Sequence, residues 1–423
     1  MSTHRPGTLI VGASQAGLQL ATSLRQLGDE APIVLAGSES QPPYQRPPLS
    51  KAFLAGKTDA ASLEFRDAQW YDAQRIDLRL GTKIERIELA GPSSGAGIAT
   101  TRAGDRIAFD RLALTVGGRA RRLHIDGSDL DGICYLRHLK DADDLRTRLE
   151  AARRVVVIGG GFIGLEAAAS ATAAGKDVTV VDVADRLLGR AVAPVVSAFY
   201  LDAHRRRGTR ILLERGINGF EGAGTVRAVR LTDATTIPAD LVLVGIGLEP
   251  RTELAEQLGL RVDRGIVVDE FARTSHPGVV AAGDCTVLPH PLTREGMVRI
   301  ESVQNAISQA QIAAASLLGI ERDERSVPWF WSDQADLKLQ IAGLSSGYDD
   351  YVVRGDPASE QFSVLYYRNG RLIAADSINA PRDYMVVRKV LGDGGTLPAD
   401  RVGDVSVPLK DLMRASTAPT AVA

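Results

Sequence analysis

The sequence predicts an α/β protein in which one βαβ core occurs twice, followed by a smaller C-terminal α+β domain. Two observations carry this prediction. The runs TLIVGASQAG (8–17) and RVVVIGGGFIG (154–164) share one order, a short apolar strand followed by glycines and the start of a helix. Each unit also closes in the same way, with an acid, an apolar run and glycine at 110–117 and 240–247. Such self-similarity indicates a duplicated structural unit.

The composition excludes several classes of function. The 423 residues carry a formal net charge of −2, so no global basic field is present to attract nucleic acid or an anionic membrane. The longest apolar run, 312–320, is far shorter than the about 20 residues of a membrane span. The N-terminus lacks the apolar core of a signal peptide. We therefore expect a cytoplasmic protein without nucleic-acid or membrane partners.

Cysteine and histidine usage predicts no metal centre. The two cysteines, Cys134 and Cys285, are far apart in the sequence. They cannot make a CxxC pair, a zinc site or an iron–sulfur cluster. The six histidines show no ligand spacing along a helix face. We interpret both cysteines as buried structural thiols, and we expect no bound metal.

The second glycine turn is the stronger nucleotide signal. Gly159, Gly161 and Gly164 fit GxGxxG, which permits a tight turn, close approach to a pyrophosphate and close helix packing. The helix N-terminus behind it favours an anion. Asp182 ends the next predicted strand (177–182) about 20 residues later, where a carboxylate accepts from ribose hydroxyls. No Arg follows directly to receive a 2′-phosphate, so NADH is favoured over NADPH.

The first glycine turn is imperfect. GASQAG places Ser14 where the middle glycine usually lies, and serine is small enough to keep a close phosphate approach. A nucleophile elbow, GxSxG, would require glycine at Ala16, so that alternative fails. The nearest carboxylate to the next strand end (32–36) is Glu39, which either binds a ribose or is a solvated loop acid.

Three further segments complete the pattern. Alternating strands at 84–109 and 217–238 predict an antiparallel insertion in each repeat. The segment HPGVVAAGDCTVL (276–288) ends a β-run in Gly283-Asp284, which is either an ordinary turn or the closure of the first nucleotide site. The segment PPYQRPPLSKAFLAG (42–56) contains four prolines, which exclude a regular helix or central strand. It predicts a stiff, cationic loop.

These motifs together resemble one known family. The order VGASQAG, YQRPPLSK, VVVIGGGFIGLE, AAGDC, RIESVQNA and WFWSDQ is similar to the FAD-dependent NADH:ferredoxin reductases of the putidaredoxin, rhodocoxin and palustrisredoxin reductase type, and the resemblance spans nearly the whole chain. They are glutathione-reductase-like flavoproteins. The resemblance implies two Rossmann-like dinucleotide-binding domains: a split FAD domain at 1–118 and 248–326, and an NAD domain at 119–247. It further implies a C-terminal interface domain at 327–414. The composition of the last residues predicts a disordered tail at 415–423.

The resemblance also implies roles for single residues. Lys51 would stand beside the reactive N5 of the flavin and pair with Glu166, so these two are the expected catalytic residues. Trp331 would lie near the flavin, although a plain core tryptophan is the alternative. The expected FAD contacts are Gly12, Ser14, Ala16, Gly17, Glu39, Arg46, Lys51, Thr115, Gly117, Gly283, Asp284, Glu301, Ser302, Val303 and Trp331. The expected NAD contacts are Gly159, Gly161, Phe162, Ile163, Gly164, Asp182 and Gly247.

Two positions depart from the family pattern. The usual ATG is Thr115-Val116-Gly117, which affects a backbone contact to FAD, and the usual PN is Glu249-Pro250, which could alter nicotinamide binding.

The implied electron acceptor is an outside protein, because the chain carries no cluster and no cysteine pair. By resemblance it is an acidic 2Fe-2S ferredoxin that serves a haem monooxygenase or an aromatic-ring dioxygenase. Arg294, Lys338 and Lys389 are candidates for a local basic docking patch, and we expect a monomer. The alternatives are an NADH oxidase, a rubredoxin or quinone reductase, or a non-enzymatic NADH sensor resembling apoptosis-inducing factor.

Overall fold

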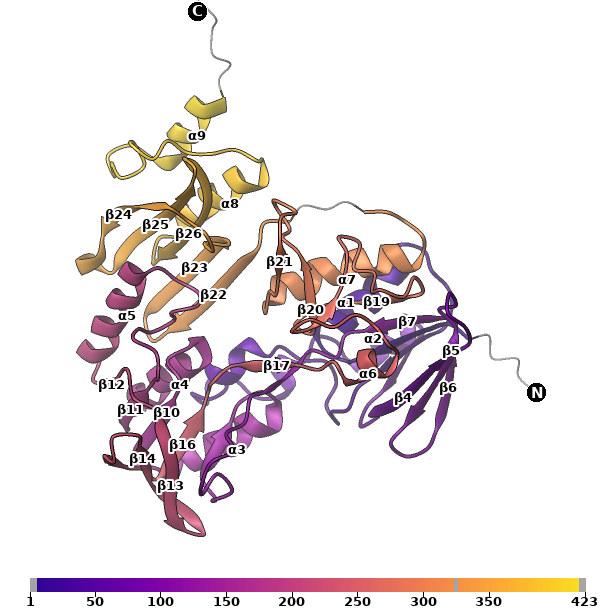
Figure 1. Cartoon of the computed structure of the whole chain (residues 1–423), viewed down its shortest axis with the longest axis horizontal. Coiled ribbons are helices and arrows are strands. Elements are labelled where there is room, and N and C mark those ends of the chain that lie inside the picture. Colours follow the sequence, from indigo (N-terminus) through magenta and orange to yellow (C-terminus); the bar gives the residue numbers. More distant parts are fainter. Residues whose placement is uncertain (1–5, 323–325, 418–423) are drawn as a thin grey trace, which may run out of the picture. The chain divides into compact units, whose positions relative to one another are not determined.

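The computed structural model describes residues 6–322 and 326–417, and its contacts divide the chain into two compact units (Figure 1). The described part of the first unit lies in 6–45, Ala61–Arg119 and Glu249–Pro328, and the second comprises Arg46–Ala60, Ala120–Leu248 and the chain from Trp329. Each unit holds one copy of the βαβ core and is described by itself. The three domain limits expected from the sequence stay a prediction. Of the expected tail at 415–423, residues 418–423 lie outside the described residues.

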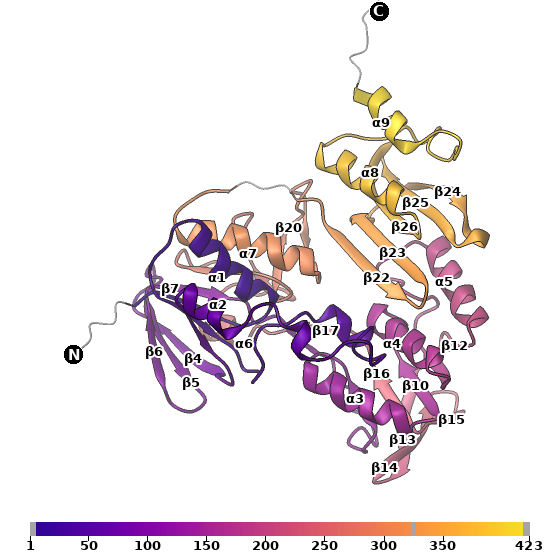
Figure 2. The ribbon, with the colours of Figure 1, turned by 180° about the vertical axis from the view of Figure 1, so that it is seen from behind.

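A five-stranded parallel sheet forms the centre of the first unit, in the order β19-β7-β1-β2-β3. Strands β1, β2, β7 and β19 are mostly buried because both faces of the sheet are covered, as is usual for a parallel sheet, whereas the edge strand β3 is partly exposed. Helices α1 and α7 lie side by side against one face and share an alanine-rich core (Figures 1 and 2). The elements are β1 (Thr8–Val11), α1 (Gln15–Gln26), β2 (Ile33–Ala36), α2 (Ala68–Ala73), β3 (Ile76–Arg79), β7 (Arg111–Leu114), β19 (Val279–Ala281) and α7 (Val303–Leu317).

The antiparallel insertion expected at 84–109 is present in this unit. Strands β4, β5 and β6 form a three-stranded sheet whose inward side chains join the other core of the unit. The insertion comprises β4 (Ile84–Leu89), β5 (Gly97–Thr101) and β6 (Arg106–Phe109). The remaining elements are η2 (Ala61–Leu63), α6 (Glu253–Gln257), β18 (Ile266–Val267), β20 (Thr286–Pro289) and β21 (Met297–Val298). Strands β8 (Gly118–Ala120) and β17 (Leu248–Pro250) pair in a two-stranded sheet.

The second unit repeats the same parallel arrangement in the order β12-β11-β10-β16-β9. An antiparallel sheet, β13-β14-β15, is inserted as expected at 217–238 and packs on the Val-rich central strands. The elements are β9 (Ile133–Tyr135), α3 (Leu139–Ala151), β10 (Arg154–Ile158), α4 (Phe162–Ala173), β11 (Asp177–Val181), α5 (Pro194–Arg206), β12 (Arg210–Leu212), β13 (Ile217–Ala223), β14 (Thr225–Leu231), β15 (Thr236–Pro238) and β16 (Leu241–Val244).

The C-terminal part of the second unit is a five-stranded antiparallel sheet in the order β22-β23-β26-β25-β24. Helix α8 lies against it (Figures 1 and 2). The elements are β22 (Trp329–Gln334), β23 (Leu337–Gly343), β24 (Asp350–Asp356), η3 (Pro357–Ser359), β25 (Gln361–Arg368), β26 (Arg371–Ile378), α8 (Pro381–Gly392) and α9 (Leu409–Thr417).

The proline-rich loop enters the second unit through one short turn. Pro47–Ser50 forms a single turn of 3-10 helix, η1, with proline in its first positions, where an amide donor is not required. The backbone NH of Lys51 donates to the carbonyl of Pro48 at 3.0 Å and ends the turn. The loop is therefore stiff, as the prolines predict, and Ser50 and Lys51 leave it at a fixed position.

Among the described helices, none has the length and apolar character that crossing a membrane requires.

Candidate functional site

The first glycine turn lies at the carboxyl end of β1, where close backbone packing excludes side chains. Gly12 adopts φ +118°, and a Cβ on it would lie 2.2 Å from the carbonyl oxygen of Thr115. A Cβ on Gly17 would lie 2.0 Å from the carbonyl oxygen of Gly12. Only glycine is compatible with either position. The hydroxyl of Thr115, which replaces the usual alanine, donates to the Gly12 carbonyl at 2.9 Å and is thereby satisfied.

The N-cap side chain of helix α1 does not accept a hydrogen bond from the first backbone NH groups of the helix. Ser14 is the N-cap residue, yet its side chain makes no capping hydrogen bond, and the first turn holds no acid. Asp67 caps α2 and Ser302 caps α7, whereas α5 begins, like α1, without a side-chain cap or an acid but does not follow a glycine turn. An uncapped helix start on a glycine turn presents backbone NH groups and a positive dipole end to an anion.

The later chain returns to this turn, as the sequence suggested for Gly283. Gly283 adopts φ +89°, and a Cβ on it would lie 3.2 Å from the Cβ of Ala16 and 3.9 Å from that of Ala306. Gly283 therefore lies against the first turn of α1 and near α7; that it closes a nucleotide site stays a prediction. Asp284 follows Gly283, and Gly117, which lies between β7 and β8, has φ +61°.

Other expected FAD contacts of this unit are engaged within it. Glu39 accepts from the hydroxyl of Tyr44 at 2.7 Å. Glu301 pairs with Arg299 at 2.8 Å. Ser302 accepts from the backbone NH of Asn305 at 3.1 Å, so that α7 begins at Val303. These bonds fix where the three segments begin and end.

The second glycine turn has the same construction in the second unit. Gly159 has φ +107°, and a Cβ on it would lie 2.4 Å from the carbonyl oxygen of Gly245. A Cβ on Gly164 would lie 2.2 Å from the carbonyl oxygen of Gly159. By contrast, a Cβ on Gly161 would meet nothing within 4 Å. Gly161 therefore faces open space, as expected where a pyrophosphate approaches.

The start of α4 is also suited to an anion. Gly161 is its N-cap residue, and the first turn holds no acid. Asp182 stands beside this turn: its Oδ2 accepts from the backbone NH of Gly160 at 2.6 Å and its Oδ1 from that of Ala184 at 2.8 Å. Each carboxylate oxygen has a further lone pair, so ribose hydroxyls can still donate to it.

The remaining expected NAD contacts belong to the same unit as this turn. The ring of Phe162 packs on that of Phe330 at 4.6 Å between centroids. Ile163 is a large apolar side chain that is 45 % exposed. Gly247 has φ +106° beyond the closing strand.

Lys51 and Glu166 form an ion pair of 2.6 Å between Nζ and Oε2. Glu166 lies on α4 and is only 4 % exposed, which is unusual for a carboxylate unless it is paired and hydrogen-bonded. Two hydroxyls supply the further bonds: Ser50 donates to Oε2 at 2.5 Å and Ser332 to Oε1 at 2.6 Å. The structure thus brings the loop lysine and the helix glutamate together in one buried cluster.

Two other residues that are expected to contact FAD, Arg46 and Trp331, contact residues outside that cluster. The guanidinium of Arg46 donates to the carbonyl of Arg137 at 2.7 Å and contacts Nδ1 of His138 at 3.2 Å. Trp331 lies on β22 with its ring 5.4 Å from that of Trp329. Whether either residue touches a flavin stays a prediction.

Sequence reasoning missed the polar residues around Glu166. Ser50, Ser332, Gln334 and His204 were not selected, although all four are buried in the structure. One signal was present: in WFWSDQ the polar Ser332 and Gln334 alternate, so they share one face of the strand. Two neutral polar side chains on one face of a strand that begins with three aromatic residues indicate a buried polar partner.

Neither cysteine is suited to redox chemistry. Both are buried and free. Burial raises the pKa of the Cys134 thiol to about 12, with Asp144 contributing, and burial raises that of Cys285 to about 12 as well. The thiolate, which is the reactive form, is therefore scarce at neutral pH. No group of three or more metal-ligating side chains is found within 6–322 and 326–417.

Two glycine turns on parallel sheets, each with an uncapped helix start, and a buried Lys–Glu pair define a dinucleotide-dependent oxidoreductase. The chain belongs to the pyridine nucleotide-disulphide oxidoreductase family, whose model matches residues 7–310. A second model, Reductase C-terminal, matches residues 329–413. These findings confirm the resemblance and the fold class predicted from the sequence.

Individual relatives match over nearly the whole chain. Rhodocoxin reductase of Rhodococcus erythropolis is 43 % identical over 95 % of this chain and 93 % of its own length. Putidaredoxin reductase of Pseudomonas putida is 43 % identical over 97 % of both chains. The crystal structure of the covalent putidaredoxin reductase–putidaredoxin complex contains a chain that superposes with a TM-score of 0.93 at 41 % identity, covering 98 % of this chain and 100 % of that chain.

Proposed function

We propose that this protein transfers electrons from NADH through bound FAD to a ferredoxin. The observation that carries the proposal is the occurrence of two glycine turns, one in each unit, on helices α1 and α4 that begin without a side-chain cap or an acid. One turn would hold FAD and the other NADH. The family and the relatives named above support this reading.

The residues of the first unit fit a dinucleotide. The turn from Gly12 to Gly17 would receive the pyrophosphate of FAD, because its NH groups are uncapped and no side chain stands in the way. Glu39 would accept from the adenosine ribose, and Asp284 from a hydroxyl of the ribityl chain. FAD, when bound, accepts a hydride from NADH and releases its electrons singly to a one-electron acceptor.

The second unit would hold NADH. Gly161 leaves room for the pyrophosphate at the start of α4, and Asp182 would accept from the ribose hydroxyls. A 2′-phosphate would be repelled by the Asp182 carboxylate, so the proposal includes a preference for NADH over NADPH.

Lys51 and Glu166 would fix the position of a positive charge at the site of hydride transfer. An ammonium held by a buried carboxylate keeps its charge in one position, which a free lysine on a loop cannot do. The stiff turn at Pro47–Ser50 limits the movement of the lysine backbone. Lys51 would thereby stabilise negative charge that develops on the flavin, and Glu166 would fix the direction in which Nζ points.

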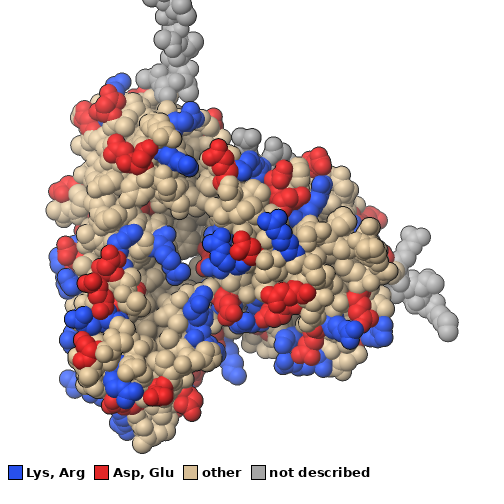
Figure 3. All heavy atoms as spheres, in the orientation of Figure 1, with Lys and Arg blue, Asp and Glu red and all other residues tan. Residues whose placement is uncertain are grey.

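The electron acceptor would be a 2Fe-2S ferredoxin that serves a haem monooxygenase. Arg294, Lys338 and Lys389 stay candidates for its docking, and Lys389 already pairs with Asp393 at 2.9 Å. On the face drawn in Figure 3, basic and acidic side chains are interspersed, so docking would depend on a local patch. A monomeric state and a cytoplasmic location belong to the same proposal.

The visible spectrum of the purified protein, before and after anaerobic addition of NADH, tests the proposal. We expect a flavin spectrum that NADH bleaches and NADPH bleaches far more slowly. A colourless protein that cannot be reconstituted with FAD would refute the proposal. Cytochrome c reduction that needs no added 2Fe-2S ferredoxin would instead favour an NADH oxidase or a quinone reductase.

A further inference from the structure

A chain of buried hydrogen bonds extends from Glu166 into the C-terminal sheet and ends on α5. Ser332 donates to Oε1 of Glu166 at 2.6 Å, and the side-chain nitrogen of Gln334 donates to the hydroxyl of Ser332 at 3.1 Å. The side-chain oxygen of Gln334 lies 2.8 Å from Nε2 of His204. Ser332 and Gln334 have no solvent exposure, and His204 is 3 % exposed.

The direction of every bond in this chain follows from the carboxylate. Glu166 can only accept, so the hydroxyl hydrogen of Ser332 points to Glu166. The hydroxyl oxygen of Ser332 is then left as an acceptor, which requires the NH₂ group of Gln334 to face it. The carbonyl oxygen of Gln334 must consequently face His204, whose Nε2 carries a hydrogen. All three donors are therefore aligned toward Glu166.

The neutral protonation state of His204 agrees with this alignment. Burial lowers the pKa of His204, while its bond to Gln334 opposes that effect and the nearby Arg207 adds to it. A neutral imidazole with hydrogen on Nε2 gives Gln334 the donor that it needs without placing a charge in the core.

The chain also leaves Glu166 with no freedom of rotation. Its two oxygens accept from Ser50, Lys51 and Ser332, which belong to the proline loop and to β22. Buried polar networks in which every member is satisfied hold one geometry, whereas a network lacking one member leaves buried groups without partners. Ser332 is the connection through which the C-terminal sheet acts on the Lys51–Glu166 pair.

We propose that Ser332, Gln334 and His204 are positioning residues that hold the Glu166 carboxylate, and through it the Lys51 ammonium, in the orientation needed for hydride transfer. This inference rests on the proposed function, since it assumes that Lys51 and Glu166 act beside the flavin. It assigns to the C-terminal sheet a part in the hydride step. Loss of Ser332 frees Glu166 Oε1, which lets the carboxylate rotate and carry Lys51 with it.

The test compares Ser332→Ala with Ser363→Ala in the FAD-loaded protein. Ser363 is a fully buried serine of the same sheet that bonds to Ser377 and Asp383, outside the chain. We expect Ser332→Ala to lower the limiting rate of flavin reduction by NADH about tenfold, as misplacement of a catalytic group does, with the KM for NADH changed by less than about twofold. Ser363→Ala should retain the wild-type rate.

Two further measurements separate positioning from general damage. In the Glu166→Gln background, Ser332→Ala should lower the rate no further, because residues that act through one another are not additive. Gln334→Met, which keeps Ser332, should give a smaller loss of about threefold and should change the ¹⁵N signals of the His204 ring in the protein. That NMR signal is independent of activity, and in wild-type protein it should report hydrogen on Nε2.

Equal rates for Ser332→Ala and Ser363→Ala, or full additivity with Glu166→Gln, would overturn the inference while leaving the proposed function intact. A wild-type flavoprotein that NADH does not reduce would refute the proposed function itself, and the inference with it. Should Ser332→Ala fail to fold, Gln334→Met decides the question alone, and a wild-type rate for it would be decisive against the inference.

Discussion

Lys51 Nζ lies 2.6 Å from Glu166 Oε2, although 115 residues separate the two in the sequence. The lysine comes from a loop stiffened by proline, and the glutamate from the helix behind the second glycine turn. A buried ion pair is a weak source of stability, because desolvation offsets most of the attraction between the charges. We therefore attribute the arrangement to the proposed function rather than to stability.

Replacing either member of this pair should slow hydride transfer. We expect Lys51→Met and Glu166→Gln each to lower the rate of flavin reduction by NADH roughly tenfold or more, since a positioned charge is lost from the reacting centre. Stopped-flow absorbance measures this rate. Lys57→Met is the matched control, because Lys57 is an exposed lysine of the same loop segment. A wild-type rate for both replacements would show that the pair is structural only.

The two glycines of the second turn should respond differently to alanine. Gly161→Ala should fold normally because its Cβ meets nothing within 4 Å, while the KM for NADH should rise roughly fivefold if about 1 kcal/mol of phosphate contact is lost. Gly164→Ala should be destabilised by about 1–3 kcal/mol or more, because its Cβ would lie 2.2 Å from a backbone oxygen. Thermal unfolding and steady-state kinetics check both. An unchanged KM for Gly161→Ala would argue against pyrophosphate at this turn.

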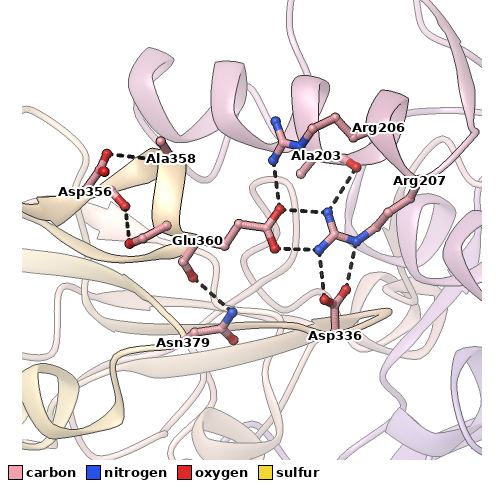
Figure 4. Close-up of polar contacts among 9 residues, drawn as sticks. Ala203, Arg206, Arg207, Asp336, Asp356, Ala358, Glu360 and Asn379 are labelled. Carbon is pink, nitrogen blue, oxygen red and sulfur yellow. Dashed lines mark hydrogen bonds and ion pairs between the residues drawn. The ribbon is translucent and has the colours of Figure 1, made fainter.

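Arg207, the C-cap residue of α5, holds the C-terminal sheet of the second unit through two carboxylates (Figure 4). Arg207 contacts Glu360 at 2.6 Å and Asp336 at 2.7 Å, and Arg206 contacts Glu360 at 2.8 Å. We expect Arg207→Met to lower the free energy of unfolding by about 1–2 kcal/mol, more than for an isolated surface pair, because the guanidinium bonds are bidentate. Arg206→Met, which removes one bond, should cost less.

The stabilisation that this cluster gives to the fold should weaken as the pH falls. The hydrogen bonds from Arg207 and then Arg206 lower the pKa of Glu360. A carboxylate with a lowered folded-state pKa stabilises the fold above its unfolded pKa of about 4.3, and this contribution is lost as the pH falls through the folded value. The decrease in the free energy of unfolding caused by Arg207→Met should therefore be largest at pH 7 and smaller in acid. An equal cost at pH 7 and at pH 3 would contradict this explanation.

Asp376 should destabilise the fold at neutral and higher pH. It is fully buried, accepts from Tyr366 at Oδ2, and has no partner for Oδ1 among the described residues. Burial raises its pKa to about 7, which the bond from Tyr366 only partly opposes. The folded state thus keeps a proton that the unfolded state releases near pH 4. Stability from this group is present below pH 4 and is lost as the pH rises toward 7.

Asp376→Asn tests that sign, because asparagine stays neutral and keeps an acceptor for Tyr366. We expect the variant to gain stability relative to wild type as the pH rises from about 4 to 7, by up to roughly 4 kcal/mol for a pKa difference of about 3 units. Denaturant unfolding at several pH values measures the difference. Parallel stability curves for the two proteins would contradict a raised pKa.

The fold was predictable because its signals are local. Each glycine turn needs specific backbone freedom, as Gly12 and Gly159 show with φ +118° and +107°, so strand, glycines and helix can be identified in sequence order alone. The site was predictable in part. Lys51 and Glu166 followed from a resemblance to a known family, since no spacing rule connects residues so distant in the sequence.

The rest of the site depends on tertiary packing. His204, Gln334 and Ser332 come from a helix and a strand that meet only in the folded unit, so their alignment toward Glu166 leaves little trace in the sequence. The Arg207 cluster was missed for the same reason: Glu360 adopts φ +57° at the end of a short turn, which directs it to α5. Charges of this type are ordinarily interpreted as solvated.

The most direct test of the whole account follows electrons to the acceptor. Protein reduced anaerobically with NADH is mixed in a stopped-flow instrument with oxidised 2Fe-2S ferredoxin, and the flavin and cluster absorbance are recorded separately. We predict rapid reoxidation of the flavin with reduction of two ferredoxins per FAD, at a rate that depends on ferredoxin concentration. A reduced flavin that persists in the presence of ferredoxin, and that only oxygen or a quinone reoxidises, would contradict the account.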